Sequence, residues 1–307
     1  MIEEKYGDLY ARDSGLRDKL VAERDIVLTY ALQDLLEHGV MNDLAFKGGT
    51  CLRKLTFGSS GRFSEDLDFT LDSPRPEDDV LTELIEALDR EYRGITFSCG
   101  DYYKTEDGTS FGADVSYTHA WNDAGRFKLQ VSLRERPTLP ISLRPMLPQA
   151  YFRYLEFEPL PVRSLQDIEM IAEKVRAAYQ RAKVRDLYDL HRFSTVPFDR
   201  GLLRQLVVLK LWQAKDPFVP EEFFEKLHDG SYDWADLRRL VRLAENVDPS
   251  AVVSSVQNGF VELRKLTDLE QRIIKDAARG GRNTPLGDRL TAEIRCRFSA
   301  TPSEPLG

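Results

Sequence analysis

The sequence predicts an α+β protein, in which an N-terminal half with a mixed sheet is followed by an all-helical C-terminal half. Strand-like runs with alternating apolar residues occur in the first 135 residues. A proline-rich segment follows at 137–161, and beyond it apolar residues recur at helical spacing to about residue 279. We therefore predict one domain over residues 1–160 and a helical domain over residues 161–307.

The elements of the first half follow from local patterns. Residues 16–38 carry apolar side chains at near-helical spacing and stop at Gly39, which favours a helix. The short apolar run LAFK reads as a strand, and TCLRKL reads as the first turns of a helix. DLDFTL alternates strictly, as a half-buried strand does. A further helix is expected at 77–92, and further strands at 95–103, 110–119 and 126–135.

Composition excludes several classes of protein. No apolar run approaches the roughly 20 residues that span a bilayer, and the acidic N-terminus is unlike a secretory signal. Three scattered cysteines argue against a disulfide framework, so we expect a cytoplasmic protein without a membrane partner. The net charge of −8 argues against a uniformly basic surface. Two basic segments nevertheless remain, at 174–192 and 272–297.

A glycine pair stands between the LAFK strand and the helix after it. Gly48 and Gly49 let the backbone approach a bulky anion, and a helix start offers free N–H groups to it. Thr50 can add a hydroxyl, and Arg53 lies three residues further on. An ordinary turn of small residues would look the same, so the glycines alone decide nothing.

Two acids lie on the next predicted strand. Asp66 and Asp68 are two residues apart, so both side chains leave the same face, while Leu67 and Phe69 point toward a core. Adjacent carboxylates repel each other unless a cation joins them, and Mg²⁺ suits such oxygen ligands. Ser64 has the same parity and could contact phosphate. A solvated strand face with scattered acids is the alternative.

The combination is more informative than its parts. A strand, a glycine pair at a helix start and an acidic strand shortly afterwards resemble the entry to a polymerase-β-like nucleotidyltransferase site. The segments FKGGTCLRK, RFSEDLDF and EKVRAAYQRAKVRDLYDL resemble the AbiEii/AbiGii nucleotidyltransferase toxins of type IV-like toxin–antitoxin systems, which include the mycobacterial MenT toxins. The resemblance covers about residues 40–195. It implies an NTP bound at Gly48, Gly49, Thr50, Arg53 and Ser64, with Mg²⁺ on Asp66 and Asp68.

The resemblance also implies a lysine and an acid from the helical half. If 165–193 is one helix, Lys174, Arg181 and Arg185 lie near one line, and Asp189 falls close to it. A solvated charged face is the alternative. We predict that Lys174 binds the triphosphate and that Asp186 takes part in catalysis. Asp189 could replace Asp186 in this role, and Lys183 could replace Lys174.

One departure concerns the metal. Many proteins of the wider superfamily carry a third carboxylate on a later strand, but that face of KLQVSLRE holds Lys128, Gln130, Ser132 and Arg134. Asp114 is a weak substitute. A two-metal site is therefore doubtful, although nucleotidyl transfer can depend mainly on positioning and charge neutralisation.

By resemblance, the acceptor is the 3′ end of a tRNA, whose extension blocks aminoacylation and translation. The family also implies a cognate antitoxin protein. Two alternatives remain open from the residues alone. The same site could transfer a nucleotide or phosphate to a protein, or the chain could be a non-catalytic module that binds a nucleotide or a partner.

Overall fold

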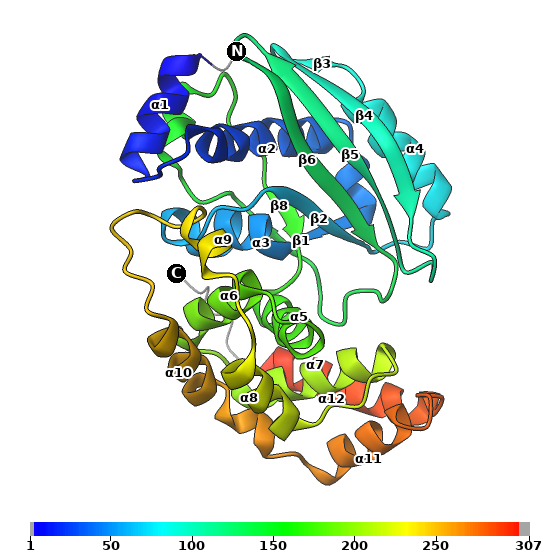
Figure 1. Ribbon diagram of the computed structural model, residues 1–307. Coiled ribbons are helices and arrows are strands. Elements are labelled where there is room, and N and C mark those ends of the chain that lie inside the picture. Colours follow the sequence, from blue (N-terminus) through cyan, green and yellow to red (C-terminus); the bar gives the residue numbers. More distant parts are fainter. Residues whose placement is uncertain (1–2, 301–307) are drawn as a thin grey trace. The chain divides into compact units, whose positions relative to one another are not determined.

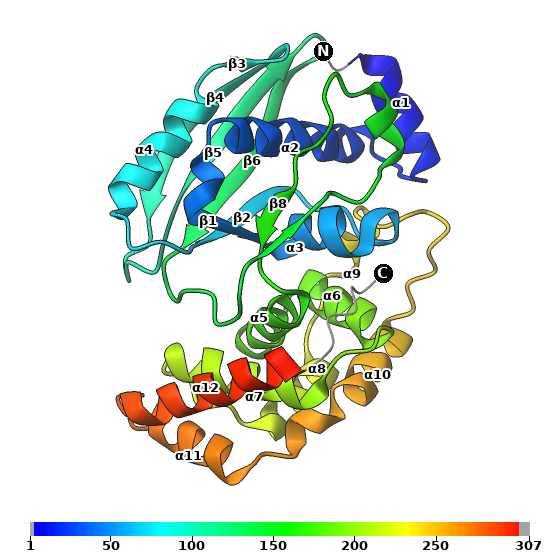
Figure 2. The ribbon, with the colours of Figure 1, turned by 180° about the vertical axis from the view of Figure 1, so that it is seen from behind.

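A computed structural model describes residues 3–300, which form two compact units (Figures 1 and 2). The first unit contains the chain up to Pro137, residues 141–165, and the short segment Arg239–Glu245. The second contains Thr138–Pro140, Gln166–Arg238 and the chain from Asn246 onward. Between residues 3 and 300, no helix combines the length and the apolar character that crossing a membrane requires.

The first unit contains an eight-stranded sheet, whose strands lie in the order β3-β4-β5-β6-β2-β1-β8-β7. Strand β2 pairs antiparallel with β1 and parallel with β6, so the sheet is mixed, as predicted. The strands are β1 (Leu44–Lys47), β2 (Asp66–Leu71), β3 (Glu91–Tyr92), β4 (Ile95–Lys104), β5 (Ser110–His119), β6 (Asn122–Ser132), β7 (Ser142–Arg144) and β8 (Val162–Ser164).

Helix α2 covers one face of this sheet. Its side chains are almost all buried from Val21 to Leu35, and in both ribbon views it runs beside the strands (Figures 1 and 2). The Tyr117 hydroxyl of β5 donates to Glu23 of α2, which identifies the covered face. Tyr117 and Asp114 point to opposite faces, so the other face of the sheet carries Asp114 and its neighbours.

The other helices of the first unit pack against α2 or against strands of the sheet. The predicted helix after the glycine pair is a single α-helical turn that continues as a π-helical segment, Leu52–Phe57. Such segments are rare and are frequent at functional sites. Helix α1 was not predicted from the sequence. The helices of this unit are α1 (Glu4–Asp13), α2 (Lys19–Glu37), α3 (Gly48–Cys51) and α4 (Glu77–Leu88).

The second unit is helical, as predicted. Helix α7, buried along nearly its whole length, packs against α5, α11 and α12. The helices are α5 (Asp167–Gln180), α6 (Val184–Ser194), α7 (Arg200–Gln213), α8 (Pro220–Asp229), α9 (Trp234–Arg238), α10 (Pro249–Gly259), α11 (Asp268–Ala277) and α12 (Thr284–Ala300).

Residues 165–193 do not form one continuous helix, which was the condition for Lys174, Arg181 and Arg185 to lie on one line. Helix α5 ends at Gln180, and Arg181 has extended backbone angles before α6 begins at Val184. No glycine or proline marks this break in the sequence. The Arg181 side chain instead bonds Asp186 of α6, so an interaction across the turn stabilises the interruption.

Candidate active site

Strand β2 places Asp66 and Asp68 on one face of the sheet. Leu67 and Phe69 are fully buried on the opposite face, whereas the two aspartates are half-buried. Asp66 pairs in register with Lys128 of β6, and Asp68 lies between Lys47 of β1 and Gln130 of β6. The carboxylates therefore lie side by side on the face that α2 does not cover.

The glycine pair lies directly against this strand. Gly48 has a φ of +80°, and a Cβ atom there would lie 2.2 Å from Asp68 Oδ2. A Cβ atom on Gly49 would lie 2.8 Å from Ser64 Oγ. The Thr50 hydroxyl donates to the Asp66 carbonyl oxygen at 2.5 Å. Only residues without side chains allow the backbone to approach the acidic strand so closely.

The structure thus brings together Gly48, Gly49, Thr50, Ser64, Asp66 and Asp68. The Thr50 hydroxyl supports the backbone of Asp66 in this arrangement. Arg62, which the sequence analysis did not single out, is buried and has its guanidinium 2.6 Å from the Cβ position of Gly49. The sequence offered one signal for Arg62, its position two residues before Ser64. That signal was weak, because basic residues are common in loops.

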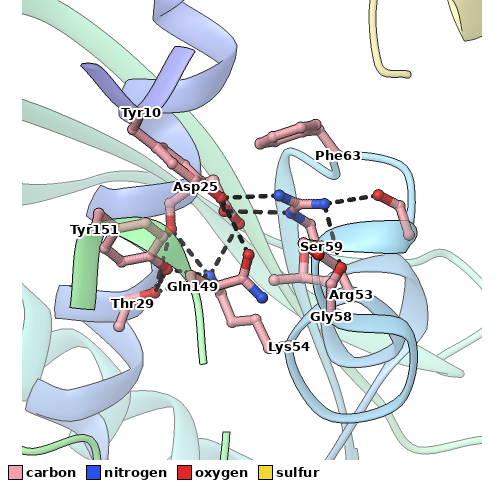
Figure 3. A network of polar contacts seen from close by, with 12 residues as sticks. Tyr10, Asp25, Thr29, Arg53, Lys54, Gly58, Ser59, Phe63, Gln149 and Tyr151 are labelled. Carbon is pink, nitrogen blue, oxygen red and sulfur yellow. Dashed lines mark hydrogen bonds and ion pairs between the residues drawn. The ribbon is translucent and has the colours of Figure 1, made fainter. Parts of the chain in front are cut away.

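Arg53 lies in a different environment from the one predicted. Its side chain is only 2% exposed. The guanidinium bonds the Asp25 carboxylate at 3.2 Å and the Tyr10 hydroxyl at 2.8 Å (Figure 3). It also donates to the Gly61 carbonyl oxygen at 2.6 Å. It also stacks over the ring of Phe63. These internal contacts favour a structural role for Arg53 over the predicted contact with a nucleotide.

Lys54 completes the same buried network. Its ammonium group bonds Asp25 Oδ1 at 3.0 Å and Thr29 Oγ1 at 2.8 Å (Figure 3). Burial lowers the pKa of Lys54, and the nearby Asp25 carboxylate only partly opposes that effect. For Asp25 the balance is reversed. Burial would raise its pKa, but Lys54 and Arg53 lower it to about 2.

The face with the aspartates offers a pair of carboxylates rather than a triad. Asp114 lies one strand beyond Lys128, which pairs with both Asp66 and Asp114 in register and approaches Asp114 Oδ1 to 3.7 Å. Within residues 3–300, no group of three or more His, Cys, Asp and Glu side chains is arranged to hold a metal. The donor chemistry of Asp66 and Asp68, beside a position that a Cβ atom would fill, fits one hard cation such as Mg²⁺.

Tyr103 of β4 also faces these acids and was missed from the sequence. Burial raises its pKa, and the charges of Asp114, Asp68 and Asp66 add to that shift. Its hydroxyl lies 3.0 Å from the Cβ position of Gly112 on β5. Gly112 therefore leaves room for the tyrosine beside the carboxylates. No local pattern in the sequence indicated this close packing.

A second cluster of charges lies between α5 and α6 in the second unit. The Lys174 ammonium group bonds Asp186 Oδ1 at 2.9 Å and Asp189 Oδ2 at 2.8 Å. Arg181 donates to the other oxygen of Asp186 at 2.9 Å. Burial would raise the pKa of Asp186, but Lys174 and Arg181 hold it well below its ordinary value. Both candidate acids therefore belong to one cluster with Lys174.

The remaining predicted cations lie outside this cluster. Arg185 makes a bidentate pair with Asp236 of α9, at 2.6 and 2.8 Å. Lys183 is exposed and precedes the first turn of α6. The predicted stripe of Lys174, Arg181 and Arg185 therefore does not exist as one surface, because the helix that would carry it is interrupted.

The fold agrees with the comparisons to known proteins. The sequence profile described as "Nucleotidyl transferase AbiEii toxin, Type IV TA system" matches residues 30–271. The chain belongs to the AbiEii family of nucleotidyltransferase toxins. As an AbiEii protein, it has the predicted α+β fold with a helical C-terminal region.

Solved structures extend this result. MenT4, a nucleotidyltransferase toxin from Mycobacterium tuberculosis H37Rv, is 27% identical and superposes with a TM-score of 0.80, over 94% of this chain and 99% of its own. JHP933 from Helicobacter pylori is 19% identical with a TM-score of 0.48, over 81% of this chain and 95% of its own. No curated protein matches the sequence. This AbiEii chain is thus a MenT-type nucleotidyltransferase toxin of a type IV toxin–antitoxin system.

Proposed function

We propose that this toxin transfers a nucleoside monophosphate from an NTP to the 3′ end of tRNA, and that the extended tRNA can no longer be aminoacylated. The observation that supports the reaction best is the contact between Gly48 and the Asp68 carboxylate, which sets a bare backbone beside two carboxylates on one strand face. The 3′ oxygen would attack the α-phosphorus and lose its proton. The bond to the β-phosphate would break, and pyrophosphate would leave.

The first unit supplies the groups for the triphosphate. Asp66 and Asp68 would hold Mg²⁺, which when bound neutralises phosphate charge and orients the α-phosphate. Gly48 and Gly49 present backbone that phosphate oxygens can approach without meeting a side chain. Ser64, next to Gly49, would donate its hydroxyl to a phosphate oxygen. Thr50 keeps Asp66 in place through its backbone.

The second unit supplies Lys174, which would stabilise the charge that develops on the leaving phosphates. The pKa of Asp186 is depressed by Lys174 and Arg181, so this acid remains a carboxylate at neutral pH. We therefore assign Asp186 and Asp189 to holding the ammonium group in place. Asp186 is not assigned to proton transfer, because a carboxylate whose pKa is lowered is a weak base.

A tRNA acceptor stem would find its cations on the second unit. Basic side chains are exposed on α11, on the turn after it and on α12. Arg279 and Arg282 flank a Gly-Gly turn that Asp276 fixes by accepting from the Asn283 N–H and from the indole of Trp212. A protein acceptor needs no such row of cations.

The substrates of this reaction, and the antitoxin that the family implies, are cytoplasmic in our proposal.

Transfer of label from each NTP to total tRNA tests this function. We expect one NTP to label tRNA, and the label to disappear when the tRNA 3′ end is oxidised beforehand. Asp68→Asn, which keeps the size and removes the charge, should give a folded protein without activity. Transfer by Asp68→Asn at the parental rate would contradict the assignment of the carboxylates. Label on protein alone, with tRNA untouched, would instead identify a protein-modifying enzyme.

The salt dependence of binding tests the acceptor separately. Each phosphate contact adds to the loss of affinity as salt rises. Replacing Arg279 and Arg282 together with glutamine should weaken tRNA binding and flatten its salt dependence, while the basal reaction of the NTP with water continues. Unchanged tRNA affinity in that double variant would place the RNA elsewhere.

A further inference from the structure

A short segment late in the sequence returns to the first unit, although the rest of that unit ends at Leu165. The returning segment, Arg239–Glu245, belongs to the first unit, although the residues on both sides of it belong to the second. Leu240 and Val241 are buried there. No pattern in the sequence predicts this excursion, because it lies in an otherwise helical region.

The returning segment binds the loop that leads into β2. The Phe63 N–H donates to the Leu240 carbonyl oxygen at 2.7 Å. Arg239 makes a bidentate pair with Glu65, with both distances at 2.7 Å. Arg242 donates to the carbonyl oxygen of Ser59. Contacts therefore run from the start of the loop to the residue directly before Asp66.

Helix α2 binds the same loop through different residues. Arg24 donates to Glu65 Oε1 at 2.8 Å, so two arginines share this carboxylate. The next residue, Asp25, bonds Arg53, which donates to the carbonyl oxygen of Gly61 at 2.6 Å. The loop is thus fixed on both sides, by α2 and by the returning segment.

We propose that Arg239 and Glu65 are positioning residues for the carboxylate pair. The inference rests on the proposed function. Glu65 stands between Ser64 and Asp66, so its two arginines fix the backbone from which both groups project. Bidentate arginine–carboxylate pairs define geometry as well as adding energy. A displacement of about 1 Å at a reacting centre can reduce a rate about 100-fold.

The pair is suited to positioning rather than to stability. Arg239 has 42% of its side chain exposed, and Glu65, which is 14% exposed, keeps Arg24 as a partner when Arg239 is replaced, so the loss of Arg239 should cost little stability. Loss of Arg239 should therefore change kcat without a matching change in melting temperature. A purely structural role would change the melting temperature and the rate together.

Arg239→Gln and Arg238→Gln form a matched pair of variants. Arg238 is the neighbouring residue, is exposed and carries the same charge. Each variant is assayed with the NTP and tRNA that give most label in the experiment above, and kcat and KM are determined separately. We expect Arg239→Gln to lose at least about 10-fold in kcat, with a melting temperature within about 2 °C of the control. Arg239→Lys, which keeps the charge, should recover part of the rate.

A kcat for Arg239→Gln equal to that of Arg238→Gln would overturn the inference. A loss of rate that follows a large fall in melting temperature would overturn it as well, because the pair would then be structural. Combining Glu65→Gln with Arg239→Gln should cost no more than the worse single variant. The proposed function itself would have failed if the parent protein transferred no nucleotide, or if Asp68→Asn did not abolish the transfer.

Discussion

Two clusters of charge in this molecule each contain an aspartate bonded to one lysine and one arginine, but their surroundings differ. In the first unit, Asp25 bonds Lys54 and Arg53. In the second, Asp186 bonds Lys174 and Arg181. The members of the first cluster are each at most 2% exposed. In the second, Lys174 is 12% exposed and Arg181 is 53% exposed.

The difference separates a structural network from a candidate functional one. Tyr10, Thr29 and Tyr151 surround the charges of the first cluster and bond to them (Figure 3). The second cluster adds another carboxylate, Asp189, and reaches the surface through its cations. A fully enclosed network can support the fold but cannot meet a substrate. A partly exposed lysine between two acids can do so.

Asp25→Asn should give the largest effect on stability. It leaves Lys54 and Arg53 buried without their shared counter-charge, a change that typically costs about 3–5 kcal/mol. Urea denaturation measures the free energy of unfolding. Asp101→Asn, at an exposed position, is the control. If Asp25→Asn unfolds at the urea concentration of the control, the first cluster does not support the fold.

Lys174→Ala should have the largest effect on activity. Loss of a group that stabilises transition-state charge typically costs about 100- to 1,000-fold in kcat. The matched control is Lys183→Ala, because Lys183 is exposed and lies just before α6. The measurement is transfer of label from NTP to tRNA. An inactive Lys183→Ala beside a fully active Lys174→Ala would mean that the wrong lysine was assigned.

The sequence predicted the parts of the site that depend on short-range geometry. Alternation within DLDFTL correctly placed Leu67 and Phe69 in the core, because neighbouring side chains of a strand point to opposite faces. The mixed sheet and the helical second half were also predicted correctly. The strand alternation and the helical second half follow from local repeats.

The sequence could not predict features that depend on distant partners. Helical spacing gave the direction of Arg53 from Thr50, but its partner Asp25 lies 28 residues earlier in the chain. The break between α5 and α6 depends on the contact of Arg181 with Asp186, since the residues at the break favour a helix by themselves. The returning segment likewise depends on Glu65, which no local pattern identifies.

Acid should lower the free energy of unfolding of the parent protein, partly because Asp25 becomes protonated. Its pKa in the folded protein is about 2, below the value of about 4 expected in the unfolded chain. A depressed pKa contributes stability above the unfolded value, and that stability is lost as the pH falls from about 4 toward 2. The loss should be about 2 kcal/mol for this one group. Urea denaturation of the parent and of Asp25→Asn at several pH values measures it, and equal slopes for the two proteins would contradict the assignment.

Arg181→Gln should have the smallest effect on stability and on activity. It also tests the comparison most directly, because Arg53→Gln makes the same change in the other cluster. Arg181 is 53% exposed, and its pair with Asp186 is screened by water, so the loss of stability should be at most about 1 kcal/mol. Asp186 keeps Lys174 as a partner, and kcat should fall less than 10-fold by the scale of such surface contacts. Arg53→Gln leaves Asp25 with one cation in a fully buried site and should cost several times as much free energy of unfolding. Equal losses in urea denaturation for the two arginine variants would mean that exposure does not distinguish the clusters.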